Sequence, residues 1–592
     1  MEIAQHMDAF ITLVVTVGVL AGLVWNRWPA EWLMMAAAVS LILLGVISPA
    51  TFLAGFANPG IMTIGALFVV AAGVQETGAL RWMLERLLGR PSSPSSALAR
   101  LMPITSLLSA FLNNTPVVAL FIGLVQGWCA RMKISPSRLL MPMSYAAILG
   151  GTCTLIGTST NLVVDGLLQS QANLPGLGIF DISALGVPVL IIGTLWMVLI
   201  GWRFLPQRKG LVEQLCNGRE YSVAMRVADK GPLHDKSIEE AGLRSLQFGY
   251  LAEIERSGKL LSMVGPDTIL QSGDRLIFVG VADTAHEVRV FRGLESDAAG
   301  LDLDHHQRRM VEAVIAPSSP VVGMNVREAR FRTRYQSVIL AVSRDGERIN
   351  SKVGDIVLRP GDTLLLEAAA DFTRLHRYNR EFLLVSTLDG NGMPNLTKAP
   401  IALAIMSLMI ITHLAGMAEL VEAAVAAAIL MVFTGCLPAA QARASIDGSV
   451  LVVIAAALGL GQAMTDSGAA QIVADQLMQL GGGSPLLMLA LVYLTTTLFT
   501  EIITNNAAAV LMFPIAMAVS EQLGVSLMPY AIAIMFAASA SFLTPLGYQT
   551  NLMVMGPGGY KVSDYMKVGL PMSLIVGVTS VALIPLIWPF TG

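Results

Sequence analysis

The chain has 592 residues, of which 54% are hydrophobic and 13% are charged. Soluble proteins carry about 25% charged residues, so this composition predicts a polytopic membrane protein. The net charge of −3 gives no reason to expect a nucleic-acid partner. Four scattered cysteines without a CxxC pair argue against a disulfide framework or a zinc site.

The first 205 residues have the pattern of a membrane domain. Apolar segments of about the length needed to cross a bilayer lie near residues 9–25, 32–48, 59–77 and 183–204. Residues 79–90 instead place apolar and charged side chains at helical spacing. That pattern predicts an amphipathic helix at the membrane interface.

Two shorter apolar segments, 101–112 and 116–128, meet at Asn113-Asn114-Thr115. Neither crosses a bilayer comfortably, so the pair predicts a re-entrant hairpin. Burying an amide without a partner costs roughly 2–7 kcal/mol, so this tip needs a ligand, an ion or a hydrogen-bonded turn. The next segment, 139–170, is interrupted by glycines and hydroxyl residues at 150–161. We expect an unwound helix there, which is tolerated in a membrane only where it lines a cavity.

Residues 206–395 form a different kind of region, with dense charge and strand-like alternation. The motif Gln271-Ser-Gly-Asp-Arg-Leu recurs 88 residues later as Arg359-Pro-Gly-Asp-Thr-Leu. The region is therefore predicted to contain two tandem α/β domains, 206–298 and 299–395.

The membrane pattern restarts at residue 396. Apolar segments lie near 398–415, 420–437, 448–465 and 569–590, with a short helix expected at 468–480. A second hairpin, 485–520, turns at Asn505-Asn506, and Glu501 takes the position that Ser109 has in the first copy. A second broken segment, 526–556, contains Ser539 to Asn551.

The halves 1–205 and 396–592 match feature by feature. Each has five crossings and one hairpin, and an odd number of crossings inverts the second half relative to the first. The predicted fold is an all-α membrane protein of two inverted repeats with inserted α/β domains, which is the sequence pattern of a secondary transporter with a midplane site.

The charges support this topology. If 206–395 is cytoplasmic, a set of basic residues falls on the cytoplasmic side: Arg27, Arg81, Arg86, Arg90, Arg131, Lys133, Arg138, Arg203, Arg443, Lys561 and Lys567. The opposite loops carry no Lys or Arg. This agrees with the positive-inside rule and predicts ten spans with both termini outside.

The hairpin tips and the breaks contain the polar residues suited to a binding site. Half-helix amino-termini suit an anion, and carbonyl, amide and hydroxyl oxygens suit Na⁺. The candidates for the substrate are Asn114, Thr115, Thr158, Ser159, Thr160, Asn505, Asn506, Thr544 and Pro545, with Asn113 and Gln549 beside them. Asn-Asn can also simply cap a turn, but two related copies beside two related breaks favour a paired site.

Glu501 is a separate candidate, because a carboxylate inside a membrane predicts function by default. It would ligate Na⁺ or carry a coupled proton. The alternative is a carboxylate near the outer mouth, either solvated or capping a helix.

The tips and breaks resemble those of the divalent anion:sodium symporters of the ion transporter superfamily. That family carries a Ser-Asn-Thr motif at each tip and a Gly-Thr-rich break, similar here to Gly151–Thr158. The resemblance implies Na⁺ ligands at Ser109, Asn114 and Gly157 in one site and at Asn506 and Ala540 in the other. Asn113 and Glu501 complete the cation candidates.

The resemblance is not complete, since Asn replaces Ser at the start of both motifs and Ala507 replaces the second Thr. These differences weigh against recognition of a carboxylate substrate. The form Thr-Glu-Ile-Ile-Thr-Asn-Asn, ending at Asn506, looks more like the branch associated with sulfate uptake.

The insert resembles two copies of the TrkA C-terminal (RCK-C) module. That resemblance implies either a ligand-sensing domain, with a small molecule as its ligand, or a dimerising cytoplasmic cap. A Gly-rich nucleotide fingerprint is missing before either copy, so no organic cofactor is predicted.

These patterns together predict a transporter of the bacterial inner membrane that moves a small anion with Na⁺ or H⁺. Sulfate is the first candidate and a dicarboxylate the second. Family resemblance implies a homodimer with elevator-like alternating access, surrounded by membrane lipid. An exporter of oxyanions such as arsenite and a channel gated by the cytoplasmic modules remain open. An enzyme is not expected, because no nucleophile–base pair can be assembled.

Overall fold

The computed structural model describes most of the chain. It covers residues 2–591 except 26–27, 80–93, 133, 209–220, 230, 244–245, 247–248, 257–258, 262–264, 266, 281–287, 289–290, 297–307, 350, 352, 370–371, 373–380, 388–395 and 546. The interfacial helix predicted at 79–90 therefore lies outside the described residues, apart from its first residue.

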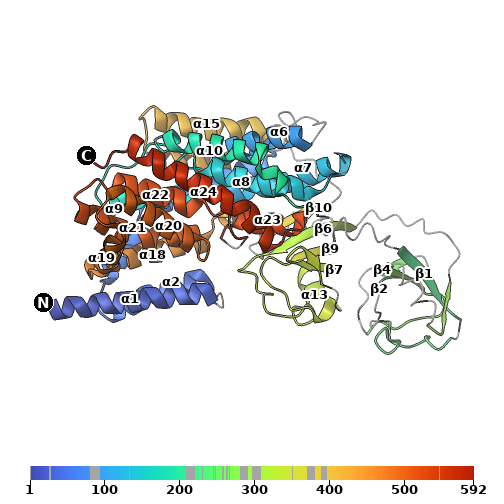
Figure 1. Cartoon of the computed structure of the whole chain (residues 1–592). Coiled ribbons are helices and arrows are strands. Elements are labelled where there is room, and N and C mark those ends of the chain that lie inside the picture. The colour runs from blue at the N-terminus through green and yellow to red at the C-terminus, as the bar shows by residue number, and fades with distance from the viewer. Residues whose placement is uncertain are drawn as a thin grey trace.

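The regular elements described in the first half are all helices (Figure 1). Its helices are α1 (Glu2–Trp25), α2 (Ala30–Leu43), α3 (Pro49–Phe56), α4 (Pro59–Glu76), α6 (Pro94–Ser109), α7 (Asn114–Met132), η1 (Pro136–Arg138), α8 (Leu140–Gly151), α9 (Ser159–Ser170), α10 (Ser183–Leu199) and η2 (Gly201–Arg203). The gap between α6 and α7 is the predicted hairpin tip, and the gap between α8 and α9 is the predicted break.

The second half repeats this order of helices. It contains η4 (Leu396–Lys398), α15 (Ala399–Leu414), α16 (Leu420–Phe433), α17 (Ala439–Ser445), α18 (Gly448–Asp466), α19 (Ala469–Gly481), α20 (Pro485–Thr500), α21 (Asn505–Leu523), α22 (Met528–Ser539), α23 (Gln549–Gly558) and α24 (Val562–Ile587). The second tip separates α20 from α21, and the second break separates α22 from α23.

Helix starts follow from local capping. The Asn58 side chain accepts the N–H of Gly60 (2.8 Å) at the start of α4, and the Asp447 carboxylate accepts that of Ser449 (3.1 Å) at the start of α18. In each case the side chain replaces a missing intrahelical bond.

The helices differ from the expectation in three places. Helices α3 and α17 lie between apolar segments, α3 between those expected at 32–48 and 59–77 and α17 between those expected at 420–437 and 448–465. Helix α3 begins at Pro49 because the Ser48 side chain accepts the N–H of Thr51 (3.0 Å). Helix α24 begins at Val562 rather than near 569, because Asp564 accepts the N–H of Lys561 (2.8 Å) and so stabilises an earlier first turn.

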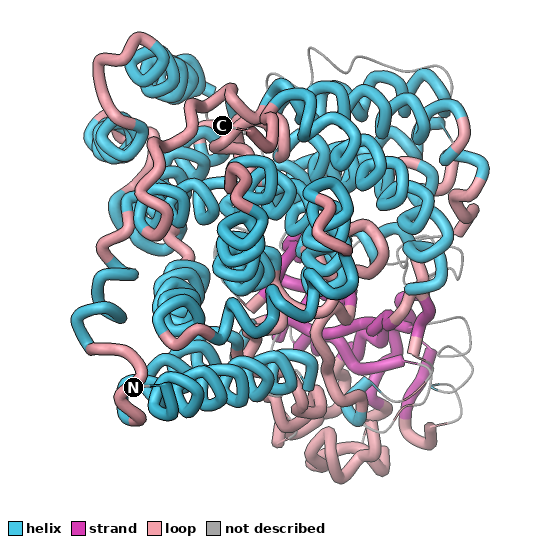
Figure 2. The backbone as a smooth tube through the Cα atoms, turned by 60° about the vertical axis from the view of Figure 1, so that its left-hand side comes forward, coloured by secondary structure: helices cyan, strands magenta, loops and turns pink. Residues whose placement is uncertain are grey.

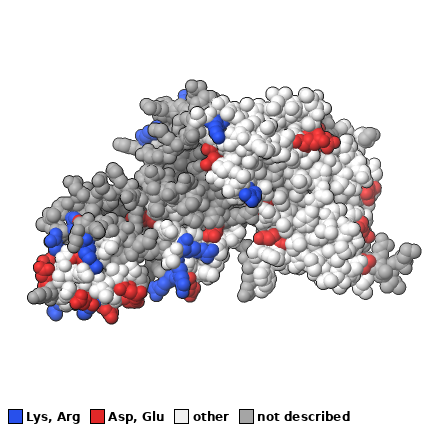
Figure 3. Space-filling view, turned by 180° about the vertical axis from the view of Figure 1, so that it is seen from behind, with Lys and Arg blue, Asp and Glu red and all other residues white. Residues whose placement is uncertain are grey.

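Several helices are long and apolar enough to cross a bilayer. Among the described residues there are 5 such helices, or 6 if α19 and α20, which are bent by 119°, form one span. Further apolar helices are shorter, and they include α2, α10, α15, α16 and α22. The helical part shows a largely uncharged surface, whereas charged side chains gather on the insert (Figure 3). The architecture is that of a polytopic helical membrane protein.

The insert contains two antiparallel sheets with the same strand order, β3-β2-β4-β1-β5 and β8-β7-β9-β6-β10. The first is built from β1 (Tyr221–Val227), β2 (Gly249–Arg256), β3 (Lys259–Leu261), β4 (Arg275–Gly280) and β5 (Leu294–Ser296). The second is built from β6 (Arg308–Ile315), β7 (Ser337–Arg344), β8 (Glu347–Arg348), β9 (Thr363–Ala369) and β10 (Phe382–Thr387), with the short helix α13 (Phe331–Tyr335) and the turn η3 (Val353–Asp355).

The predicted offset of 88 residues recurs in these sheets. Arg256 pairs with Asp274 at 2.7 Å in the first, and Arg344 pairs with Asp362 at 2.7 Å in the second. Each aspartate belongs to the repeated Gly-Asp motif, so the motif supplies a buried carboxylate that anchors an arginine of the neighbouring strand. The described part of the insert is mainly β rather than α/β.

The second sheet lies against the helices beside α23, and the first lies farther out (Figure 1). In the turned view the strands lie at the lower right, below part of the helices (Figure 2). The helices share one large apolar core, and each sheet has a smaller core of its own.

Candidate anion and cation site

The tip of the first hairpin is the turn between α6 and α7. The Ser109 hydroxyl donates to Asn114 Oδ1, and Asn114 Nδ2 donates to the Tyr548 hydroxyl. Asn114 is 1% exposed and Ser109 is 0% exposed. Because both ends of the amide are hydrogen-bonded, the orientation of Asn114 is fixed.

The tip of the second hairpin makes the same bond with different residues. Thr500 donates to Asn505 Oδ1 over 2.8 Å, at the five-residue separation of Ser109 and Asn114. The expected match of Glu501 with Ser109 is therefore wrong by one residue, and Thr500 is the structural counterpart. The two Asn-Asn pairs are not structurally equivalent residue by residue, because the first helical residue is the second asparagine in one tip and the first asparagine in the other.

An asparagine closes each broken helix. Asn161 Nδ2 donates to the carbonyls of Gly151 (3.3 Å) and Thr154 (3.0 Å). Asn551, 390 residues later, makes the two equivalent bonds at 3.1 and 3.4 Å. The unwound backbone thereby finds donors within the protein, as buried carbonyls in an apolar region require.

The helices that follow the tips and the breaks meet at their amino-termini. Ser159 and Thr160 of α9 donate to Asn506 Oδ1 of α21, both over 3.2 Å. Thr115 of α7 donates to Gln549 Oε1 of α23, also over 3.2 Å. Two pairs of helix amino-termini are thus in contact. Each helix start has N–H groups without an intrahelical acceptor and a positive dipole end, which together favour an anion.

Tyr548 connects the two pairs, and the sequence analysis missed it. It precedes α23 and is 8% exposed. Its hydroxyl bonds Asn114 and also pairs with Thr158, which precedes α9. The available signal was a tyrosine inside a Gly-Tyr-Gln break, because a buried tyrosine hydroxyl normally finds a polar partner.

Glu501 lies behind the second tip and is 9% exposed. Its carboxylate oxygens accept the N–H groups of Leu543 and Thr544, both over 2.9 Å. The hydroxyls of Thr154 and Thr544 donate to the backbone carbonyls of Ala110 and Glu501, respectively. Ala110 is therefore the counterpart of Glu501, and the carboxylate that caps the second break has no equivalent in the first.

The other predicted residues surround this cluster. Gly157 lies against the Gly151 carbonyl, where a side chain would clash. Ala540 ends α22 and is 4% exposed, and Pro545 is buried within the second break. Asn113 instead lines an otherwise mainly apolar cavity with Ser159, between α4 and α15.

Buried oxygen atoms at the breaks fit a hard cation. Asn161 Oδ1 and Ser539 Oγ are buried without a hydrogen-bond partner among the described residues. Amide, hydroxyl and unwound carbonyl oxygens are the groups that hold Na⁺ in broken-helix transporters. The residues at hand therefore fit an oxygen-liganded Na⁺, with Asn114, Asn506 and these atoms as its nearest candidates.

Comparison with known proteins identifies the family to which the chain belongs. The model described as "Citrate transporter" (CitMHS) matches residues 20–521 and 423–591. The chain belongs to the citrate transporter family. It is accordingly a transporter and not an enzyme.

Several relatives are similar over nearly the whole chain. A putative sulfur deprivation response regulator of Chlamydomonas reinhardtii is 36% identical, over 93% of this chain and 97% of the relative. An uncharacterized transporter of Synechocystis sp. is 31% identical, over 98% and 97%. Sodium/sulfate cotransporter 1 of C. reinhardtii is 26% identical, over 89% and 84%. This citrate transporter family member is thus an integral membrane protein that carries an anion, and the predicted relation to divalent anion:sodium symporters is supported.

Proposed function

We propose that the protein is a cation-coupled secondary transporter with sulfate as its first substrate candidate and a dicarboxylate as its second. The observation that carries this proposal is the contact between the amino-termini of α7 and α23 and between those of α9 and α21. Four positive dipole ends and a set of hydroxyl and amide donors can bind a tetrahedral dianion without a basic side chain. Relatives named sodium/sulfate cotransporters support sulfate.

Residues 1–205 and 396–592 form the two inverted repeats of this proposal. Ten crossings place both termini outside and residues 206–395 in the cytoplasm of a bacterium. The matching bonds at the tips and breaks support the repeat, and the basic residues support the orientation. A homodimer with elevator-like movement follows from the family resemblance.

Na⁺ is the proposed coupling ion, held at the two tips by the candidates named above. Glu501 offers a second route, in which a proton is carried on the carboxylate that caps the second break. The two RCK-C-like domains, 206–298 and 299–395, are proposed to regulate transport or to join the two subunits.

Uptake by purified protein in liposomes tests the proposal. Labelled sulfate should accumulate when Na⁺ is high outside, and labelled succinate should compete weakly. Accumulation driven only by a proton gradient would support sulfate as the substrate and would indicate that the coupling ion is a proton carried on Glu501. Arsenite efflux without sulfate uptake would replace symport by export, and ion flux through voltage-clamped bilayers without any gradient coupling would identify a channel.

A further inference from the structure

One face of strand β6 is directed at the membrane helices. Val311, Ala313 and Ile315 pack in the core of the second sheet, whereas Val314 belongs to the apolar core of the helices. Successive side chains of a strand point to opposite faces. Glu312 therefore lies on the same face as Val314, against the helices.

Glu312 is 0% exposed in this contact. Gln126 of α7 donates its amide to Glu312 Oε2 over 3.0 Å, and Glu312 Oε1 is buried without a hydrogen-bond partner among the described residues. An ionised carboxylate in this position would be desolvated with half of its acceptors unused, which is costly. A protonated carboxyl avoids most of that cost.

The fold of the sheet itself does not need this acid. The 88-residue offset places Ala224 of β1 at the position of Glu312. The two residues have equivalent partners in the neighbouring strand, since Ala224 pairs with Ile277 and Glu312 pairs with Leu365, 88 residues later. The residue that corresponds to Val314 is Arg226, which is exposed. The buried acid thus belongs to the contact with the helices, which among the described residues is made by this face of the second copy, whereas the first copy has the exposed Arg226 there.

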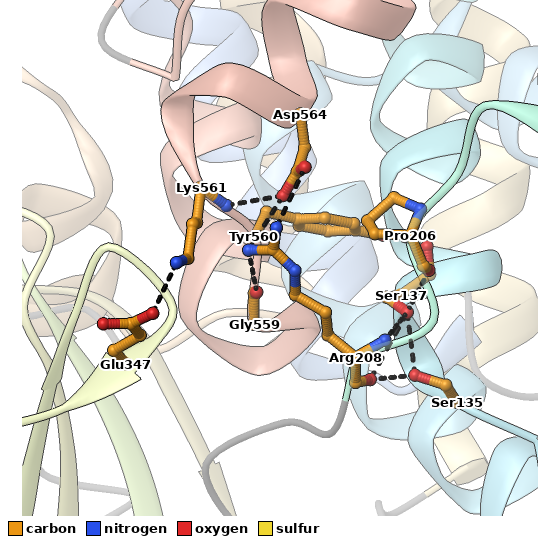
Figure 4. Close-up of polar contacts among 9 residues, drawn as sticks. All are labelled: Ser135, Ser137, Pro206, Arg208, Glu347, Gly559, Tyr560, Lys561 and Asp564. Atoms are coloured by element: carbon orange, nitrogen blue, oxygen red, sulfur yellow. Dashed lines mark hydrogen bonds and ion pairs between the residues drawn. The ribbon is translucent and has the colours of Figure 1, made fainter.

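The same sheet also contacts the cytoplasmic end of α23 (Figure 4). Glu347 forms an ion pair with Lys561, just beyond that helix. Arg208, at the start of the insert, pairs with Asp564 at 3.1 Å and donates to the Gly559 carbonyl over 3.4 Å. The second sheet therefore contacts α7 and the end of α23, whose opposite ends form half of the anion site.

We propose that Glu312 is a positioning residue: in its protonated form it lets the second sheet bind α7 and α23, and in its ionised form it loosens that contact and so alters transport. The first part of the proposal is the contact between the sheet and the helices. The second part, the effect of that contact on transport, rests on the proposed function.

Among the residues that the structure describes, few charged groups face Glu312 from the surrounding elements. Glu367 of β9 is on the same face of the sheet, and Arg308 and Arg309 begin β6 itself. Arg131 is the single charged residue of α7 and bonds a carbonyl of its own helix. Helix α23 and strand β10 contain none. Desolvation therefore dominates the titration of Glu312.

Burial raises the pKa of Glu312 from 4.5 to about 7, against the smaller lowering effect of the Gln126 hydrogen bond. A raised pKa means that the docked state holds the proton more tightly than the undocked state. The contribution of this proton to docking is full below about pH 4.5 and is lost as the pH rises through about 7. Proton linkage between these two pKa values gives about a tenfold weaker docking equilibrium at pH 8 than at pH 6.

Amide hydrogen exchange of the full-length protein in lipid nanodiscs tests this docking. After correction for the intrinsic pH dependence of exchange, protection of β6 and the second half of α7 should fall about tenfold between pH 6 and pH 8. Glu312→Gln and Glu312→Ala should abolish the dependence. Glu347→Gln is the matched control, because it removes an acid that is 70% exposed from the same interface and should keep the dependence.

Retention of the pH dependence in both Glu312 variants, or its absence in the wild type, would overturn the proposal. Uptake of labelled sulfate into liposomes buffered inside at pH 6 to 8 then measures the consequence for transport. The wild-type profile should change around pH 7 and the Glu312→Gln profile should not. If the wild type transports neither sulfate nor succinate, the proposed function is refuted. The hydrogen-exchange result would still show whether protonation of Glu312 controls docking of the sheet.

Discussion

Single residues of the site are bonded to one another. Asn114 has both ends of its amide engaged, and Asn506 accepts two hydroxyls through one oxygen. An anion that enters must compete with these bonds or use N–H groups that remain unpaired. Affinity should therefore depend on the partners that orient each asparagine as well as on the asparagines.

Tyr548→Phe tests this dependence. The change removes one hydrogen bond to Asn114, worth about 1 kcal/mol, so the apparent affinity for sulfate should fall about fivefold while the maximal rate changes little. Concentration-dependent uptake measures both quantities. Tyr530→Phe is the control, because it removes a hydroxyl that bonds the Pro485 carbonyl (3.0 Å) away from the site. Equal affinities in the two variants would show that Tyr548 does not orient Asn114.

Glu501→Gln should affect both stability and coupling. A carboxylate accepts the N–H groups of Leu543 and Thr544, whereas an amide can accept only one of them. The unsatisfied N–H should lower the free energy of unfolding by about 1–3 kcal/mol, measured by thermal unfolding in detergent. Glu521→Gln changes an exposed acid and should not destabilise the protein. If cation dependence of uptake survives in Glu501→Gln, the carboxylate only caps the break.

Hairpin tips and breaks are the elements that the sequence located best. The breaks expected at 150–161 and 539–551 span the gaps between α8 and α9 and between α22 and α23, and the tips expected at 113–115 and 505–506 lie at the starts of α7 and α21, next to the gaps that precede them. Polar residues and glycines within an apolar segment indicate a tip or a break, because a continuous apolar helix would bury their polar groups without partners. The register between the two tips could not be read in this way, because two adjacent asparagines align equally well at either of two offsets.

The contact between α23 and the second sheet gives a prediction at this scale. A side chain on Gly556 would overlap Thr363 of β9, whereas Gly127 of α7 has open space around its α-carbon. Gly556→Ala should therefore separate the sheet from α23 and increase hydrogen exchange in β9. Gly127→Ala should be neutral or stabilising by up to about 1 kcal/mol, because alanine favours a helix over glycine. Unchanged exchange in Gly556→Ala would mean that the sheet does not dock on α23 in solution.

For the whole molecule, the proposed topology can be tested by cysteine accessibility. Met417 lies 78% exposed in a loop assigned to the outside, and Arg443 is exposed on the side assigned to the cytoplasm. Met417→Cys should react with a membrane-impermeant maleimide in intact cells, and Arg443→Cys only after permeabilisation. The reverse pattern would mean that the protein has the opposite orientation in the membrane. Reaction of both cysteines in intact cells would contradict the predicted number of crossings between the two residues.

The sequence by itself determined the membrane class, the helical segments, the two tips and breaks, and the duplicated insert. These properties follow from local composition and spacing, which each segment carries wherever it lies in the fold. Only the tertiary structure decided that Tyr548 reaches Asn114, that Thr500 rather than Glu501 matches Ser109, and that Glu312 is buried against Gln126. Each of these is a contact between side chains brought together by packing, or a register that packing selects, so no local pattern could specify it.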